Sequence, residues 1–187
     1  MYLGLANQGL IDIFFADETA FSLAPYIPYC YQKKGTQLAI PSVRTSVLKV
    51  LGFLNPITKQ LVTYNLPEKT NLDSELFIKF MSDFASKITR TTIVVLDNAS
   101  PHKSALTKAM FSKWEEQGLF IQFLPPRCPH LNPIEILWKR MKYHWFCVSD
   151  YRSKERLLKK IKHIFKNFAE SYDISFTMKV FNEHLNT

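Results

Sequence analysis

Three acidic residues stand at positions suited to binding a divalent cation. Asp17 ends the apolar run LIDIFFA, Asp97 ends the run TIVVL, and Glu135 begins a predicted helix. Carboxylate oxygens are the preferred ligands of hard cations such as Mg²⁺. Three neighbouring carboxylates repel one another, and a cation bound between them offsets that repulsion. The pattern therefore predicts a metal site built from two strand ends and the start of a helix.

Each acid also has a purely structural interpretation. An Asp-Asn pair after a strand commonly forms a turn, as Asp97 and Asn98 would do. Asp17 fits the same description, with Glu18 as a competing ligand. Residues 132–135 read Asn-Pro-Ile-Glu, which fits an N-cap, a proline at the first helical position and a capping box. The residues alone leave both interpretations open.

Polar residues beside the acids are candidates for contact with a phosphate backbone. Lys139 and Lys142 follow Glu135 by four and seven positions, so they share its helix face. That spacing suits a metal beside phosphates, and it suits intrahelical salt bridges equally. His102 could meet a phosphate, assist at the scissile site, or be an exposed histidine near a helix N-terminus. Asn98 could orient the preceding aspartate, contact nucleic acid, or simply form the turn after the strand.

Hydrophobic periodicity indicates the elements that must position these residues. Predicted strands cover residues 11–15, 42–55, 60–66, 92–96 and 119–124. The first three form a meander, and later strands alternate with helices, which gives a mixed sheet with helices on its faces. We therefore expect an α/β fold, a ribonuclease-H-like mixed five-stranded sheet with helices on both faces. In this topology the first and fourth strands are neighbours, which brings Asp17 toward Asp97.

The predicted helices have clear apolar faces and start signals. The first is capped by Thr70 or Asn71, and the second starts at Ser100-Pro101 with Leu106 on its apolar face. The third begins before Glu135. A fourth, amphipathic helix carries apolar residues from Leu157 to Phe168 inward and lysines outward. A last short helix is expected from Ile174 onward.

Composition limits the class of protein. With 187 residues and 47% apolar content, the chain suits one packed domain, which we place at 11–187 with residues 1–10 as the end of a linker. No apolar run approaches the roughly 20 residues of a membrane span, and the N-terminus lacks signal-peptide features. Three widely spaced cysteines form no zinc pattern or disulfide framework. We expect a cytoplasmic protein with no membrane partner.

The positive charge is concentrated near one end. The net charge is +8, and residues 139–166 hold ten Lys or Arg against two acids. The rest of the chain balances, with 14 of the 24 basic and 14 of the 16 acidic residues. A basic face of this kind indicates a polyanion, most simply nucleic acid, or else a solvated helix surface.

Three segments together resemble the catalytic domain of mariner-type transposases, and most closely their bacterial insertion-sequence relatives in the DDE superfamily. These segments are FFADETAFSL, VVLDNASPH and LPPRCPHLNPIEILWKRMK. The resemblance covers about residues 11–146. The family's three acids fall on Asp17, Asp97 and Glu135, with the last two at a spacing in the family's range. Arg127 and Cys128 depart from the family's usual tyrosine-serine pair, which affects loop contacts with DNA.

This resemblance implies a DDE endonuclease that cleaves phosphodiesters at transposon ends and joins the 3′-hydroxyl to target DNA. It implies two Mg²⁺ ions, with Mn²⁺ as a substitute, held by Asp17, Asp97 and Glu135. Lys139 and Lys142 would hold the phosphate backbone. The implied partners are double-stranded DNA and a second copy in a homodimer. The family's N-terminal DNA-reading domain is absent from this sequence and would be a separate part.

Two other functions fit parts of the sequence. A catalytically silent binding module would keep the same fold for DNA or protein contact, although the intact carboxylates favour an enzyme. An unrelated metal phosphotransferase would use a doubly wound sheet of mostly parallel strands. The predicted meander argues against that second alternative.

Overall fold

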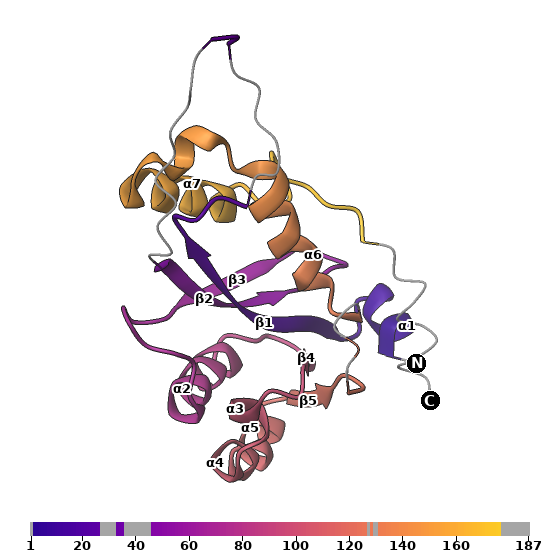
Figure 1. The fold of residues 1–187 in the computed structure, drawn as a ribbon. Coiled ribbons are helices and arrows are strands. Elements are labelled where there is room, and N and C mark those ends of the chain that lie inside the picture. The colour runs from indigo at the N-terminus through magenta and orange to yellow at the C-terminus, as the bar shows by residue number, and fades with distance from the viewer. Residues whose placement is uncertain (1, 27–32, 36–45, 127, 129–130, 177–187) are drawn as a thin grey trace.

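The computed structural model describes residues 2–26, 33–35, 46–126, 128 and 131–176. Its five strands are β1 (Asp12–Ser22), β2 (Ser46–Leu54), β3 (Leu61–Asn65), β4 (Thr92–Leu96) and β5 (Leu119–Phe123). They form one sheet in the order β3-β2-β1-β4-β5 (Figure 1). The β1–β2 and β2–β3 pairs are antiparallel, and the β1–β4 and β4–β5 pairs are parallel. This confirms the mixed sheet and the adjacency of the first and fourth strands, and it excludes a mostly parallel doubly wound sheet.

The strand β1 is longer than predicted. We expected it to end before Asp17, but it continues to Ser22 because its distal half pairs with β2, with Asp17 opposite Gly52 and Phe21 opposite Leu48. Asp17 therefore lies inside a strand and not at its end. The apolar run stops earlier than the strand because the pairing, and not the side-chain type, keeps the backbone extended.

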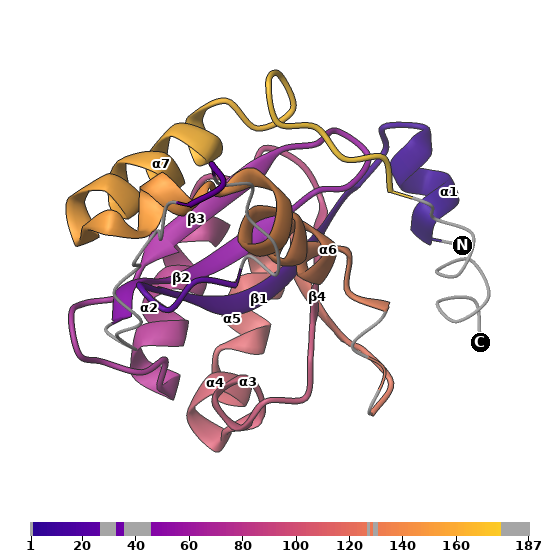
Figure 2. The ribbon, with the colours of Figure 1, turned by 45° about the horizontal axis from the view of Figure 1, so that its top comes forward.

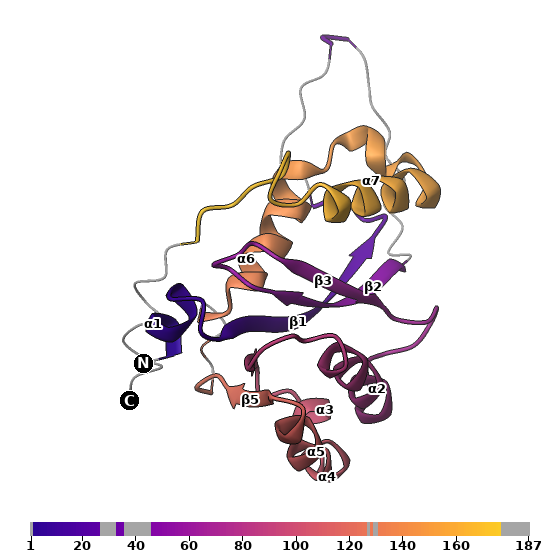
Figure 3. The ribbon, with the colours of Figure 1, turned by 180° about the vertical axis from the view of Figure 1, so that it is seen from behind.

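Helices cover both faces of the sheet. The elements on one side are α2 (Ser74–Ala85), α3 (Ser100–Lys103), α4 (Ala105–Ala109) and α5 (Phe111–Glu116). Those on the other side include α6 (Pro133–Arg140), the π-helical η2 (Met141–Trp145), the 3₁₀ turn η3 (Val148–Arg152) and α7 (Lys154–Lys166). Figure 3 shows the same layers from behind. Figure 2 shows α6 lying across β1 and β2, with α7 beside it.

Side-chain alternation along the strands assigns each residue to a face. Phe14 and Val94 belong to the core under α2 and α5, and Phe15 and Val95 point to the opposite side. There α6, η2 and α7 pack on β1 and β2 through a second core that includes Phe21, Val50, Leu54, Ile134, Trp138, Leu157 and Ile161. The sheet is thus sealed on both sides.

Several helix predictions need correction. Asp73 caps α2 by accepting from the Leu76 N–H at 2.9 Å, in place of Thr70 or Asn71. The helix expected after Ser100-Pro101 is three short helices, because Ser104 leaves the helical conformation and caps the next segment. Leu106, predicted to face the core, is 60% exposed.

The two ends of the chain also differ from expectation. Residues 1–10 were expected to be the end of a linker, and the structure places α1 (Tyr2–Asn7) there, with Leu3 and Ala6 buried against the sheet. Residues 174–176 are not helical, and the remainder of the expected last helix lies outside the described residues. No helix among the described residues is long and apolar enough to span a membrane.

Candidate active site

The β1–β4 register places the first two acids side by side. Phe14 pairs with Val94 and Phe15 with Val95. Asp17 lies two positions after Phe15, and Asp97 lies two positions after Val95. Both acids therefore lie on the same sheet face as Phe15 and Val95. Because β4 ends at Leu96 while β1 continues, Asp97 lies just past its strand end and Asp17 within the neighbouring strand.

A glycine allows the third acid to approach. Gly52 on β2 is paired with Asp17, and a Cβ at this position would lie 2.6 Å from a ring carbon of Trp138 and 2.9 Å from Cδ1 of Ile134. Such distances are too short for real atoms, so only glycine lets α6 pack this closely. The close packing places Glu135, on the first turn of α6, where its charge acts on Asp17.

The start of α6 is fastened to β1 by Asn132. Its Nδ2 donates to the backbone carbonyl of Ala16 at 3.3 Å, and its side chain makes no cap hydrogen bond to the helix. A capping box needs that cap, so the purely structural interpretation of Glu135 loses one of its two hydrogen bonds. The Asn132 Oδ1 atom is buried without a hydrogen-bond partner among the described residues.

The three acids interact electrostatically. The pKa of Asp17 is raised to about 7, first by burial, then by the charge of Glu135 and the charge of Asp97. The Glu18 backbone and the Trp138 indole oppose this rise. The Trp138 N–H lowers the pKa although its position falls short of a hydrogen bond. Asp17 is thus an acid whose charge is unfavourable until a cation compensates it.

Asp97 has the opposite environment. Its Oδ1 atom lies 2.8 Å from Nδ1 of His102 and accepts the backbone N–H of Ala99 at 3.0 Å. Since an ionised carboxylate only accepts, Nδ1 of His102 carries the proton and donates. This hydrogen bond is the main reason that the pKa of Asp97 is lowered, although burial opposes it. Its side chain is 49% exposed, so one face of the carboxylate remains open.

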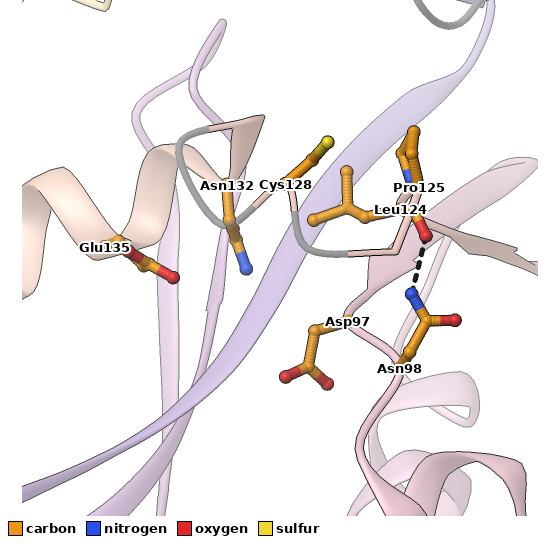
Figure 4. A pocket seen from close by; sticks show the side chains of 7 residues that line it. All are labelled: Asp97, Asn98, Leu124, Pro125, Cys128, Asn132 and Glu135. Carbon is orange, nitrogen blue, oxygen red and sulfur yellow. Dashed lines mark hydrogen bonds between the residues drawn. The ribbon is translucent and has the colours of Figure 1, made fainter.

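Two cavities meet at Glu135. The first, about 250 Å³, is lined by Asp97, Asn98, Leu124, Pro125, Cys128, Asn132 and Glu135. Figure 4 shows the Asp97 and Glu135 carboxylates and the Asn132 amide directed toward this space. The second, about 280 Å³, is lined by Asp17, Glu18, Thr19, Tyr26, Glu135, Trp138, Lys139, Lys142 and Tyr143. Glu135 therefore connects the Asp97 side with the Asp17 side.

The predicted phosphate contacts have different positions. Lys139 is exposed on the rim of the second cavity, and Lys142 is half-buried with its Nζ donating to Thr19 Oγ1 at 2.8 Å. Asn98 donates to the Leu124 carbonyl at 2.7 Å and so ties the loop after β4 to the end of β5. Cys128 lines the first cavity, and Arg127 lies outside the described residues.

The structure buries His102, which contradicts both the predicted phosphate contact and the exposed position. Its side chain is 3% exposed, and its ring lies 4.5 Å from that of Phe77, centroid to centroid. A buried ring is not available to a phosphate. Instead it holds Asp97, while its Nε2 atom is buried without a partner in the described part of the chain.

The donor set fits a divalent cation. Burial, and after it the charges of Glu135 and Asp97, raise the pKa of Asp17, and a cation between the three carboxylates would offset their repulsion. Within the described residues, no three His, Cys, Asp or Glu side chains stand close enough to hold one ion as placed.

Several residues that shape this site were missed in the sequence. Gly52, Thr19, Tyr26 and Tyr143 were not singled out as site residues. A glycine inside a strand pattern signals close approach of another element, so Gly52 carried a usable signal. The other residues carried none, because their roles depend on how η2 and the end of β1 meet.

Comparisons with known proteins agree with this geometry. The family profile of the DDE superfamily endonuclease matches residues 12–158, which is most of the chain. The chain belongs to this family. No curated protein sequence matches this DDE endonuclease.

Solved structures resemble its fold. The catalytic domain of Mos1 mariner transposase aligns with a TM-score of 0.61 and 12% identity, covering 91% of this chain and 79% of that one. The Mos1 paired-end complex with left transposon end aligns with a TM-score of 0.60 and 14% identity, covering 91% of this chain and 54% of that one. The Mos1 paired-end complex with Mn aligns with a TM-score of 0.59 and 12% identity, covering 86% of this chain and 50% of that one. The DDE endonuclease therefore has the ribonuclease-H-like fold and spans about half the length of the transposase chains in these complexes.

Proposed function

We propose that this DDE endonuclease is the catalytic domain of a metal-dependent DNA transposase of an insertion sequence. It cleaves phosphodiesters at transposon ends and joins the 3′-hydroxyl to target DNA. One observation carries the proposal. The three acids come from β1 (Asp17), the end of β4 (Asp97) and α6 (Glu135), yet they lie on the same side of the sheet. The charges of Glu135 and Asp97 both contribute to the raised pKa of Asp17. Family membership and the fold shared with the Mos1 catalytic domain support it.

The three acids have distinct roles in this proposal. Asp17, Asp97 and Glu135 would hold two Mg²⁺ ions, or Mn²⁺ as substitute, at the two cavities that share Glu135. When bound, the ions lower the pKa of the attacking water, activate the 3′-hydroxyl and stabilise the leaving oxygen. Asp97 presents its open face because His102 fixes its other side. Positioning and charge stabilisation then carry the phosphoryl transfer without a covalent protein intermediate.

Basic residues around the acids hold the DNA in this proposal. Lys139 is exposed on the helix face of Glu135, and exposed basic side chains continue along α7, among them Arg156, Lys159 and Lys162. Asn98 lines the cavity beside Asp97 and can contact the strand there. Such contacts fix the position of the backbone without reading bases. The proposed enzyme is cytoplasmic, associated with the nucleoid in a bacterium.

The proposed assembly is a homodimer that holds two DNA ends, with a separate N-terminal part that reads the terminal repeats. The neighbours named for Mos1 are paired-end and strand-transfer complexes, which supports an assembly of this type. Sedimentation of the chain with and without DNA tests the dimer directly. A monomer on DNA at every concentration would remove this part of the proposal and leave the chemistry untouched.

Metal-dependent nicking of supercoiled plasmid is the decisive experiment. Wild type should nick with Mg²⁺ or Mn²⁺ and not with EDTA, and Asp97→Asn or Glu135→Gln should lose more than about 100-fold in rate. Glu116→Gln, which removes an exposed acid on α5, is the matched control and should nick normally. Plasmid binding in EDTA should be similar for all four proteins.

The same assay separates the enzyme from a silent binding module. A silent module binds the plasmid but shows no metal-dependent nicking in the wild type. If Asp97→Asn nicked as fast as wild type, the assignment of the acids would be wrong. Both outcomes are distinct from a misfolded variant, which loses plasmid binding as well.

A further inference from the structure

The second cavity contains an aromatic pair that the proposed chemistry does not use. Tyr26 follows the end of β1, and Tyr143 lies in η2. Their ring centroids are 5.9 Å apart, and both line the cavity that also contains Asp17 and Glu135. The side chains remain 37% and 46% exposed. The two rings meet edge-to-face with 70° between their planes, which leaves an exposed ring face beside the partly buried Asp17 carboxylate on which a flat ligand can stack.

A preorganised lysine stands between the rings and the acids. The Nζ atom of Lys142 donates to Thr19 and lies 5.4 Å from the Tyr26 centroid and 5.6 Å from that of Phe21. Burial lowers the pKa of Lys142, and the charge of Asp17 opposes that decrease. The ammonium group is thus held in one place by a hydroxyl and two ring faces.

The cavity offers three kinds of contact in one small volume. Its tyrosine rings can stack, Lys139 and Lys142 supply positive charge, and Asp17 with Glu135 form the proposed metal side. An apolar peptide would leave the charged groups desolvated and unpaired, which is costly. A cation alone would leave the rings and lysines unused. A nucleotide has a flat base, a negative phosphate and a phosphodiester for the metal side, so it matches all three.

We infer that this cavity binds one unpaired DNA nucleotide next to the phosphodiester held at the carboxylates. Its base stacks on the exposed ring of Tyr143, which Tyr26 meets edge-to-face, and its phosphate contacts Lys139. The inference rests on the proposed function, because it requires DNA at the three acids. It adds a preference of the enzyme. DNA ends or junctions with an unstacked terminal base are bound in preference to a continuous duplex. Stacking on aromatic rings tolerates any base, so this selection is structural and not sequence-specific.

A fluorescent base tests the inference directly. The probe is a DNA duplex with a short 3′ overhang that carries 2-aminopurine at its first unpaired position, and a blunt duplex of the same sequence is the reference. Binding is measured in EDTA, so cleavage plays no part. Wild type should quench 2-aminopurine on binding and should bind the overhang about tenfold more tightly than the blunt duplex.

Variants separate stacking from folding and from charge. Tyr143→Ala should lose the quenching and the preference for the overhang, while Tyr143→Phe should keep both because the ring remains. Tyr2→Ala is the matched control, since Tyr2 lies on α1 and is as exposed as Tyr26, at 37%. It should behave as wild type. Thermal melting of each variant verifies that the fold is intact.

Each outcome decides one proposal. Equal binding of overhang and blunt DNA by wild type, or a preference that survives in Tyr143→Ala, would overturn the nucleotide pocket. Loss of the preference in Tyr143→Phe would assign the effect to the hydroxyl and overturn stacking. These results are independent of the plasmid assay, which uses metal and cleavage. Metal-dependent nicking without an overhang preference would leave the proposed function standing and remove only this inference.

Discussion

Asp17 and Asp97 occupy equivalent register positions on neighbouring strands, yet their surroundings shift their pKa values in opposite directions. Asp17 lies under α6, where burial and the charges of Glu135 and Asp97 raise its pKa to about 7. Asp97 lies at a strand end, where the His102 hydrogen bond is the main cause of its lowered pKa. The environment of Asp17 thus disfavours its ionised form, whereas the environment of Asp97 favours its ionised form.

This contrast indicates how a metal site can be assembled in advance. The Asp97 side is fixed by a buried histidine and remains ionised, so it can receive a cation first. The Asp17 side gains most from the cation, because its charge is the more costly one without it. Pairs of carboxylates with pKa values pushed apart are typical of sites where the two groups have different tasks. Four predictions follow this contrast, from the largest expected effect to the smallest.

Asp17→Asn should stabilise the metal-free protein at high pH. The folded pKa of about 7 lies above the unfolded value of 3.8. Asp17 therefore contributes stability that is full below pH 3.8 and lost as pH rises through 7, where folding requires a buried charge. Removing the charge should raise the free energy of unfolding at pH 8 by an amount of order 4 kcal/mol. Urea denaturation in EDTA measures it.

The pH dependence distinguishes this effect from ordinary repacking. The difference between variant and wild type should shrink toward zero by about pH 3, where Asp17 is largely protonated in both states. Mn²⁺ should then stabilise wild type more than Asp17→Asn and reduce the gap at pH 8. A stabilisation of the same size at pH 3 and pH 8 would show that charge at Asp17 is not its source.

His102→Phe should weaken the Asp97 side without removing the acid. Phenylalanine preserves the contact with Phe77 but cannot donate to Asp97 Oδ1. Loss of the residue that supports a metal-binding carboxylate typically reduces metal affinity or activity by about 10–100-fold. The readouts are Mn²⁺ affinity by titration calorimetry and the plasmid nicking rate.

His102→Asn is the matched variant for that experiment. Its side-chain N–H can take the place of Nδ1, so it should recover part of the Mn²⁺ affinity despite leaving a void beside Phe77. A merely structural histidine predicts the reverse order, with Phe better than Asn. That order would remove His102 from the site.

Gly52→Ala should displace α6 on the Asp17 side only. The added Cβ would lie 2.6 Å from the Trp138 ring, so the helix must move, and overpacking of this kind costs about 1–3 kcal/mol. Displacing α6 separates Glu135 from Asp17 and should also lower the pKa of Asp17. The free energy of unfolding and the pH dependence of stability measure both effects. An unchanged pH dependence would mean that α6 packing does not set the charge at Asp17.

Most of the framework could be predicted from the sequence because it depends on local patterns. The strand order followed from the meander and from alternating apolar runs, and the adjacency of β1 and β4 brought Asp17 toward Asp97. The apolar face of α7 was likewise read from spacing, since Leu157, Ile161 and Ile164 are buried. These features need only periodicity and topology.

The electrostatics of the site could not be predicted in this way. His102 was expected at the surface because a histidine near a helix start is usually exposed, and only the packing of α2 places Phe77 against it. The capping box at Glu135 was equally plausible until Asn132 was seen to bond to Ala16. Both outcomes depend on contacts between residues far apart in the chain, which spacing does not encode.

Asp97→Asn should have the smallest effect on stability and the opposite sign to Asp17→Asn. A lowered folded pKa means that Asp97 contributes stability above its unfolded pKa and loses it as pH falls through the folded value. Asparagine can still accept from His102 Nδ1, so only the charge is lost. Because the side chain is half exposed, that charge should be worth less than about 1 kcal/mol at pH 7. Urea denaturation in EDTA, beside Asp17→Asn, gives both signs in one experiment, and two stabilising substitutions would mean that His102 does not compensate the charge of Asp97.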